Sequence, residues 1–356
     1  MRYFIVIILF LATGIFVFQN FRPDAEITGL IPVIDTKSEK TKIIIRDLDT
    51  PWAIGFLPNK NILVSERKGA VSEIDISTGI KLSEIRVSGV KEIGEGGLLG
   101  LAIDPDFSKN NFVYLYYTTR QENQVTQNRV SRFEYKNRNL ESEEIIVDNI
   151  PGAANHNGGR LKFGPDGNLY ITTGDAQNES LAQNTGSLAG KILRLVNGKA
   201  EVYSYGHRNP QGLAWDIEGQ LWSTEHGPSG ISSGNDELNK IDQGKNYGWP
   251  IIRGKEMRDG MEISIIESGK SDTWAPSGLA FLDGKLYFGG LRGSALYEYD
   301  ILKGKLTEHF KNEFGRIRDV ILGPDSMLYI TTSNLDGRGK PNDGDDKIIR
   351  INPDLL

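Results

Sequence analysis

The sequence contains no cysteine, and histidine is scarce, with only four in 356 residues. The lack of cysteine excludes disulfide bonds, thiolate metal sites, a cysteine nucleophile and a lipid-modified N-terminal cysteine. A basic excess is also missing, because the formal net charge is -6 and the isoelectric point is near 5.5. We therefore expect no nucleic-acid partner, since nucleic-acid-binding surfaces are basic.

Several common patterns are absent as well. No segment sustains the 3.6-residue apolar spacing of an amphipathic helix. There is no Walker A loop and no His-Glu-x-x-His sequence. The glycine-rich run at 94–100 only resembles a dinucleotide fingerprint, because it lacks the spacing and the following helix that would hold a pyrophosphate. The sequence therefore argues against a nicotinamide cofactor.

One long apolar run is present, from Tyr3 to Phe18 after Arg2. As a helix it would cover about 24 Å, less than the roughly 30 Å of a bilayer core. Its length suits a signal peptide, yet no Ala-x-Ala cleavage site follows it. We predict that residues 1–22 are a signal peptide or, preferably, a retained membrane anchor, and that 23–41 form a polar linker. An exported protein, periplasmic or on the extracytoplasmic cell surface, is expected.

The rest of the chain repeats a phrase in which a turn precedes alternating β-branched and aromatic residues. Glycine is abundant, at 41 residues, which fits a turn-rich all-β chain. The strand cores recur at intervals of 50, 57, 52, 65 and 42 residues, beginning at Ile62, Phe112, Leu169, Leu221, Leu286 and Leu328. Six such units predict a six-bladed β-propeller of four-stranded antiparallel blades over residues 42–356.

The stretch from Asn155 to Asp175 carries the strongest indication of chemistry. It begins with His156 in a glycine-flanked loop and ends with a carboxylate beyond a short strand. The two ionisable groups are expected at neighbouring loop ends on one face of a sheet. A histidine oriented by a carboxylate is the usual general base near neutral pH. The alternative is a histidine that only hydrogen bonds within its loop.

Two other loops hold candidate ligands. Arg208 and Asn209 lie beside a proline-fixed turn, where an arginine can bind a carboxylate or stabilise negative charge. A salt bridge between blades is the alternative. A later loop that ends in Asp236 and Glu237 gathers oxygen ligands of the kind that Ca²⁺ prefers. The alternative is that this loop is a solvated acidic segment that binds no metal.

Two arginines, Arg316 and Arg318, enter the last unit two residues apart. In a strand they would point to the same face. Such a pair suits an acidic cofactor, although paired arginines are also common as plain surface charge.

Together these phrases resemble the soluble quinoprotein glucose dehydrogenases, and more closely the aldose sugar dehydrogenase branch of that family. The resemblance extends from about residue 49 to 352. It rests on Gly-Leu-Leu-Gly-Leu-Ala-Ile-Asp-Pro-Asp-Phe at 97–107, Gly-His-Arg-Asn-Pro-Gln-Gly-Leu at 206–213 and Asn-Tyr-Gly-Trp-Pro at 246–250. It implies oxidation of aldose sugars at the anomeric carbon to lactones, with pyrroloquinoline quinone (PQQ) and Ca²⁺ bound on top of the propeller.

The resemblance also implies roles for single residues. His156 would take the proton of the anomeric hydroxyl while hydride passes to the quinone, with Asp175 orienting it and Arg208 stabilising charge on the quinone. The further cofactor contacts would be Glu95, Asn155, Asn209, Arg292, Arg316 and Arg318. The calcium ligands would be the backbone carbonyls of Gly227 and Pro228 for the ion at the cofactor, and Asp236, Glu237 and Tyr247 for a second, structural ion.

Three positions depart from the glucose dehydrogenases. Glu95 stands where they carry a glutamine, Asn155 where they carry an aspartate, and Arg292 near a lysine. A second anion beside a tricarboxylate is unfavourable unless it is protonated or close to the Ca²⁺. The long substrate-pocket insertions of those enzymes are missing, which predicts an open site with broad aldose specificity.

Two other functions stay open. A calcium-dependent lactonase on a six-bladed propeller would need several carboxylate and amide ligands converging on one central metal. A non-enzymatic binding module at the cell surface is the other alternative, because propellers commonly serve as scaffolds. The sequence does not identify the electron acceptor of a dehydrogenase.

Overall fold

The computed structural model describes residues 39–121, 125–228 and 234–356. The predicted signal or anchor at residues 1–22 and most of the predicted linker lie outside these residues. Within the described part, no helix is both long enough and apolar enough to cross a membrane.

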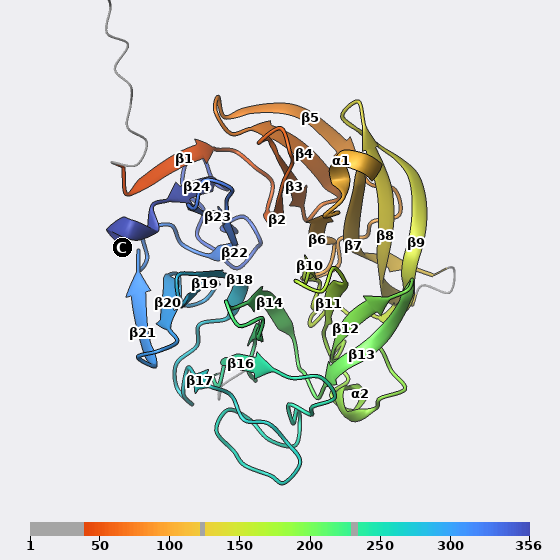
Figure 1. Cartoon of the computed structure of the whole chain (residues 1–356), viewed down its shortest axis with the longest axis vertical. Coiled ribbons are helices and arrows are strands. Elements are labelled where there is room, and N and C mark those ends of the chain that lie inside the picture. Colours follow the sequence, from red (N-terminus) through yellow and green to blue (C-terminus); the bar gives the residue numbers. More distant parts are fainter. Residues whose placement is uncertain (1–38, 122–124, 229–233) are drawn as a thin grey trace, which may run out of the picture. The chain divides into compact units, whose positions relative to one another are not determined.

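Six four-stranded antiparallel sheets are arranged as the blades of a ring, which confirms the predicted six-bladed β-propeller (Figure 1). From its inner to its outer strand, the first blade consists of β2 (Pro51–Phe56), β3 (Ile62–Glu66), β4 (Ala70–Asp75) and β5 (Ile80–Arg86). The second blade consists of β6 (Leu98–Ile103), β7 (Phe112–Arg120), β8 (Thr126–Lys136) and β9 (Asn139–Pro151). The third blade consists of β10 (Leu161–Phe163), β11 (Leu169–Thr173), β12 (Lys191–Val196) and β13 (Lys199–Tyr205). The fourth blade consists of β14 (Pro210–Trp215), β15 (Leu221–Glu225), β16 (Glu237–Ile241) and β17 (Ile266–Glu267). The fifth consists of β18 (Pro276–Leu282), β19 (Lys285–Gly290), β20 (Leu296–Asp300) and β21 (Lys305–His309). The sixth consists of β22 (Ile317–Leu322), β23 (Leu328–Thr332), β24 (Ile348–Ile351) and β1 (Thr41–Ile45).

Burial decreases from the middle of each blade outward. The second strands β3, β11, β15 and β23 are buried at every position, because neighbouring blades cover both of their faces. The outer strand β5 is mostly half-buried or exposed. Helix is limited in the described residues to the short α1 (Phe107–Asn110), α2 (Ser180–Gln183) and the 3₁₀ turn η1 (Pro353–Leu355), in keeping with the missing helical periodicity.

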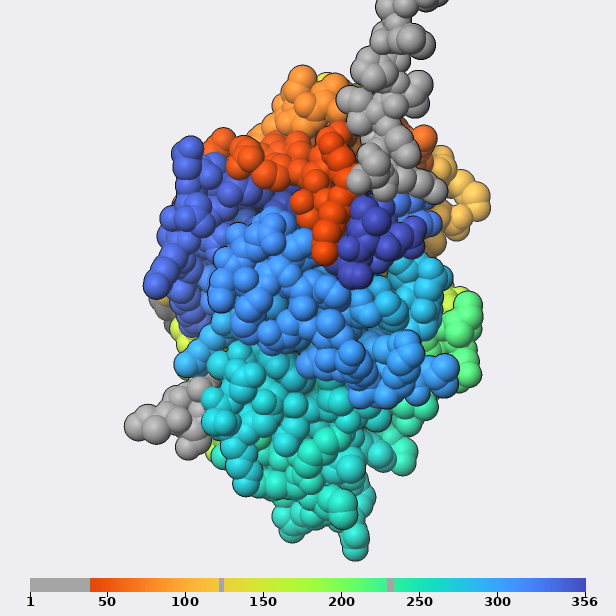
Figure 2. All heavy atoms as spheres, turned by 90° about the vertical axis from the view of Figure 1, so that its left-hand side faces the viewer, coloured from red at the N-terminus to blue at the C-terminus, as the bar shows by residue number. Residues whose placement is uncertain are grey.

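The last blade is completed by the first strand of the domain. β1 pairs antiparallel with β24, with Thr41 opposite Ile351 and Ile43 opposite Ile349. Figure 2 shows the red residues of β1 beside the dark blue residues near the C-terminus. The sequence repeats did not predict this pairing. It closes the ring by joining the two ends of the described chain in one sheet.

The inner strands begin with irregularities that shape the centre of the ring. In β2, β6, β14, β18 and β22 the pairing register shifts near the first residues, as in a β-bulge. A bulge adds one residue and turns its side chain away from the regular alternation. The extra residues in β2, β14 and β22 are Trp52, Gln211 and Arg318. Arg316 precedes β22 and Arg318 lies in its bulge, so the regular alternation expected for this pair does not hold.

Candidate active site

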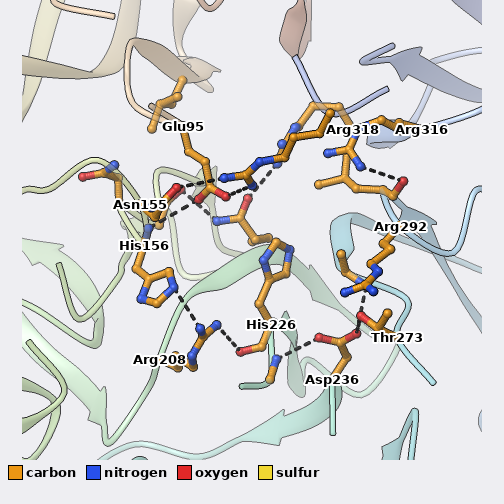
Figure 3. Close-up of a pocket in the computed structure, with 18 of the residues that line it drawn as sticks. Glu95, Asn155, His156, Arg208, His226, Asp236, Thr273, Arg292, Arg316 and Arg318 are labelled. Atoms are coloured by element: carbon orange, nitrogen blue, oxygen red, sulfur yellow. Dashed lines mark hydrogen bonds and ion pairs between the residues drawn. The ribbon is translucent and has the colours of Figure 1, made fainter. Parts of the chain in front are cut away.

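A cavity of about 640 Å³ lies at the end of the ring where the inner strands begin. We call it the basin. Ten of the predicted site residues line it: Glu95, Asn155, His156, Arg208, Gly227, Pro228, Asp236, Arg292, Arg316 and Arg318. Figure 3 shows arginines and carboxylates facing one another across it. Asp175, Asn209, Glu237 and Tyr247 lie behind or beside this lining.

His156 is held between a carboxylate and a guanidinium. Its Nδ1 lies 2.8 Å from Asp175 Oδ1, and its Nε2 lies 2.9 Å from Arg208 Nη2. An arginine can only donate, so Nε2 is the unprotonated nitrogen and Nδ1 carries the proton that is donated to Asp175. His156 also has a φ of 60°, a conformation that non-glycine residues rarely adopt. The result is a base at the lining of the basin whose lone pair accepts a hydrogen bond from Arg208.

Asp175 is itself fixed at both oxygens. Its Oδ1 accepts a second hydrogen bond from the backbone N–H of Gln177 at 2.8 Å. Its Oδ2 accepts from the indole Nε1–H of Trp249 at 2.9 Å. The carboxylate is only 1% exposed, so these bonds are shielded from water. Asp175 can therefore hold the His156 ring in one orientation and stabilise it when protonated.

Arg208 is anchored from below by Glu225. The Glu225 carboxylate accepts hydrogen bonds from the backbone N–H groups of Arg208 and Asn209, and lies 2.8 Å from His207 Nδ1. The Arg208 guanidinium packs over Trp249, with its Cζ 5.3 Å from the ring centroid. Burial lowers the pKa of Arg208 from its usual value. The side chain is thus a rigid, largely dehydrated cation beside His156.

Asn209 lies behind the lining of the basin and forms hydrogen bonds there. Its Oδ1 accepts from Gly158 N at 2.9 Å and from Gln211 Nε2 at 3.1 Å. Its Nδ2 lies 3.4 Å from His226 Nδ1. These bonds tie the loop that carries His156 to blade four.

The opposite wall is cationic. Arg318 donates from Nη1 to Gln211 Oε1 at 2.9 Å, and Arg316 donates from Nε and Nη2 to Asp336 Oδ2 at 2.9 and 2.7 Å. Burial lowers the pKa of Arg318 to about 9, so the side chain stays protonated at neutral pH. Arg292 adds a third guanidinium from the loop after β19. An anion bound in the basin would offset the cost of burying these charges.

Glu95 and Asn155 share a partner that was not predicted. Arg338, in the loop between β23 and β24, forms a close ion pair with Glu95 and donates from Nη2 to Asn155 Oδ1 at 2.9 Å. Burial alone would raise the pKa of Glu95, but Arg338, His226 and Arg318 outweigh burial and lower it to about 2. Glu95 is therefore an anion, and its charge is balanced by an arginine rather than by protonation.

Asp236 lines the basin, but its carboxylate is fully engaged. Oδ1 accepts from Gly227 N at 2.8 Å. Oδ2 accepts from Thr273 Oγ1 and from the backbone N–H groups of Trp274 and Ala275, at 2.7, 2.7 and 2.8 Å. In this arrangement the side chain holds the loop that presents Gly227 and Pro228, and its predicted role as a metal ligand stays a prediction.

Glu237 and Tyr247 lie at a second, much smaller cavity of about 10 Å³ that is also lined by Glu225, Gly227 and Pro228. The Tyr247 hydroxyl donates to Lys240 O at 2.7 Å and accepts from Asp242 N at 2.8 Å, so it stabilises its own loop. Burial, and then the charge of Glu225, raise the pKa of Glu237 to about 8. Across residues 39–121, 125–228 and 234–356, no three His, Asp or Glu side chains are grouped to hold a metal ion.

Several residues of the site were not predicted from the sequence. Gln211 and Trp249 stood inside two of the phrases that carry the family resemblance, so a detectable pattern existed for them. Trp52 and Arg338 had no comparable pattern. Trp52 enters the basin through a bulge, and Arg338 reaches it from a loop of the last blade.

The fold and the basin define a propeller with an enzyme-like site, in which an oriented histidine base faces a wall of arginines. The chain belongs to the glucose/sorbosone dehydrogenase family, whose model matches residues 48–349. This confirms the family resemblance that the sequence phrases indicated.

Individual relatives agree with this membership. The chain is 31% identical over 333 residues to the aldose sugar dehydrogenase YliI of Escherichia coli, covering 82% of this chain and 89% of that protein. The PQQ-bound aldose sugar dehydrogenase of Streptomyces coelicolor is 36% identical, with a TM-score of 0.81 over 87% of this chain and 97% of that one. A putative glucose dehydrogenase of Thermus thermophilus is 39% identical, with the same TM-score over 87% and 99% of the two chains. These relatives support an oxidoreductase.

Proposed function

We propose that this protein oxidises aldose sugars at the anomeric carbon to lactones, with PQQ and Ca²⁺ bound in the basin, and that it accepts many different aldoses. The observation that carries the proposal is the unprotonated Nε2 of His156, which accepts from Arg208 at the lining of a basin that also holds Arg292, Arg316 and Arg318. The PQQ-bound relative from Streptomyces coelicolor supports the choice of cofactor.

The residues of the basin fit an acidic, planar cofactor. Arg318 Nε and His226 Nε2 are buried and have no hydrogen-bond partner among the described residues, so acceptors or donors of a ligand would satisfy them. Arg292, Arg316 and Arg318 would hold the carboxylates, while the Gly227 and Pro228 carbonyls would face the Ca²⁺. When bound, PQQ would supply a quinone that accepts the hydride from the sugar C1.

The protein's own part in the reaction is to take a proton and to stabilise charge. As the sugar enters, its anomeric hydroxyl replaces Arg208 as the partner of His156 Nε2, which then accepts the hydroxyl proton. Asp175 stabilises the resulting imidazolium through Nδ1–H. Arg208 remains beside the site as a fixed cation for negative charge that develops nearby.

Reconstitution tests this function. The purified protein is supplied with PQQ and Ca²⁺, and sugar-dependent reduction of an artificial dye is followed for a panel of mono- and oligosaccharides. We expect PQQ-dependent turnover of several aldoses. No turnover, together with no binding of PQQ in calorimetry, would favour the non-enzymatic binding module. Turnover of glucose alone would overturn only the broad specificity.

Export and tethering through residues 3–18 belong to the same proposal, and the apolar run in that segment supports them. Fractionation of cells that produce the full chain tests it. The protein is expected with the membrane or in the periplasm, and recovery in the cytoplasm would contradict export.

Trp249→Phe is expected to lower kcat by roughly 10- to 100-fold, the equivalent of a hydrogen bond to a charged group worth about 1.5–3 kcal/mol. The change keeps an aromatic ring between the guanidiniums of Arg208 and Arg253, whose Cζ atoms lie 5.3 and 5.4 Å from its centroid. It removes the indole N–H that fixes Asp175. Steady-state kinetics of the reconstituted protein checks the prediction. An unchanged kcat would show that the Trp249 hydrogen bond does not matter to catalysis.

Calcium is expected to stabilise the protein more at pH 8 than at pH 5. The pKa of Glu237 is raised from its ordinary 4.5 to about 8 in the folded state, so without metal its contribution to stability is full below 4.5 and is lost as pH rises through 8. A cation near Glu237 would remove that loss. At 100 times its Kd, bound Ca²⁺ would add about 2.7 kcal/mol.

Urea unfolding with Ca²⁺ or with a chelator, at pH 5 and at pH 8, measures this difference. Glu237→Gln serves as the control, because the neutral amide should remove both the pH dependence and most of the calcium effect. Equal effects of Ca²⁺ at both pH values in the unmodified protein would contradict the prediction.

A further inference from the structure

Arg338 lines the basin, and the proposed function gives it no role. It lies in the loop between β23 and β24, in the sixth blade, yet its side chain contacts the loops that precede the second and third blades. The guanidinium pairs with Glu95 through Nη1 and with Asn155 through Nη2. Its side chain is 55% exposed and that of Glu95 is 24% exposed, so the pair lies at the rim of the basin.

The position of Arg338 is fixed by the same carboxylate that fixes Arg316. The Oδ1 of Asp336 accepts from the backbone N–H of Arg338 at 2.9 Å, and its Oδ2 accepts from Arg316 Nε and Nη2. The Asp336 backbone carbonyl also lies 3.4 Å from Arg67 Nη1. Arg338 therefore sits on a loop that is anchored to the cationic wall, rather than on a free surface segment.

The fixed position of Arg338 matters because Arg338 balances the negative charge of Glu95. Its carboxylate lies in a basin whose predicted ligand is a tricarboxylate, and its Oε2 lies 3.4 Å from the backbone N of His156. An uncompensated carboxylate here would repel the ligand, and burial would strengthen the repulsion by weakening the screening of water. A contact with Arg338 removes most of that repulsion and also holds Asn155 beside the base.

We propose that Arg338 is a positioning residue for cofactor binding, which acts by neutralising Glu95 and holding the Glu95–Asn155 edge of the basin in place for an acidic quinone. The inference rests on the proposed function, because it takes PQQ as the ligand. If this inference is right, PQQ binds tightly to a basin that contains Glu95 in place of a neutral amide only while Arg338 is present.

A double-mutant cycle on PQQ affinity tests the inference. The Kd for PQQ is measured by calorimetry, with Ca²⁺ present, for the unmodified protein, Arg338→Gln, Glu95→Gln and the double variant. We expect Arg338→Gln to raise the Kd at least about tenfold when Glu95 is present, and less than about threefold in the Glu95→Gln background. Lys340→Gln, an exposed change on the same loop, is the matched control and should leave the Kd unchanged.

The outcomes separate the two proposals. If the unmodified protein does not bind PQQ, the proposed function fails and this inference fails with it. If the unmodified protein binds PQQ but Arg338→Gln binds equally well, only the inference is overturned. An equal loss in both backgrounds also overturns it, because Arg338 would then act on the ligand and not through Glu95. Thermal unfolding of each variant shows whether a changed Kd reflects a folded protein.

Discussion

Replacing His156 with alanine is expected to lower kcat and kcat/KM for sugar-dependent dye reduction together, by about 10²- to 10⁴-fold. This is the usual contribution of a positioned general base. The base acts only in the transition state, so its loss should leave the KM for the sugar nearly unchanged. In the structure, Asp175 holds Nδ1 of His156, and Arg208 donates to Nε2, which is the unprotonated nitrogen of the ring. Steady-state kinetics of the PQQ-loaded variant provides the measurement.

The matched control is His309→Asn. His309 ends the outer strand β21 and lies 3.1 Å from Glu298, and it does not line the basin. Its replacement should leave kcat within about twofold of the unmodified protein. A His156→Ala variant that retained activity within a few-fold would show that another group takes the proton, and the assigned mechanism would then be wrong.

Replacing Asp319 with asparagine is expected to destabilise the protein by about 3–5 kcal/mol, the usual cost of breaking a buried ion pair by removing one partner. Asp319 is 3% exposed and Arg160 is 6% exposed, and their carboxylate and guanidinium lie 2.9 Å apart. Asp319 Oδ2 also accepts from the backbone N–H of Ile54 at 3.0 Å. Arg160 donates from Nε to the carbonyl of Gln211 at 2.9 Å. One ion pair thus joins four blades below the basin.

A shift of the urea midpoint measures the effect. Asp259→Asn, at an exposed position, is the surface control and should leave the midpoint unchanged. Combining Asp319→Asn with Arg160→Met should recover part of the loss, because the buried Arg160 cation that lost its partner is then removed as well. If the double variant were less stable than Asp319→Asn alone, an uncompensated charge would not be the cause of the loss.

Most of the fold could be predicted because each blade repeats the same local pattern. The strands at Leu169 and Leu328 have the same sequence, Leu-Tyr-Ile-Thr-Thr, and both became fully buried second strands. Alternation and turn residues act over a few positions, so a single sequence reveals them. The contact between His156 and Asp175 could be predicted for a similar reason, since the hairpin of β10 and β11 lies between them and brings its two ends together.

The remaining features depend on contacts between distant parts of the chain. Local alternation predicted that Arg316 and Arg318 share a face of a regular strand, whereas in the structure a register shift between Ile317 and Asp319 interrupts the alternation and both arginines still line the basin. Arg338 meets Glu95 only because the ring brings the sixth blade close to the second. No spacing in the sequence indicates that Arg338 and Glu95 lie together in the folded protein. For the same reason the sequence left the charge of Glu95 unexplained.

The pairing of β1 with β24 also sets the order of events during synthesis. At roughly 5–20 residues per second, the ribosome needs tens of seconds to make the chain between these two strands. During this time β1 has no partner, and the five complete blades cannot form a closed ring. Such distant pairing is intrinsically slow, because the entropy of a long loop must be lost before any contact is gained. The circular architecture therefore arises only after β24 has been made, when the earliest-made strand of the domain joins the last.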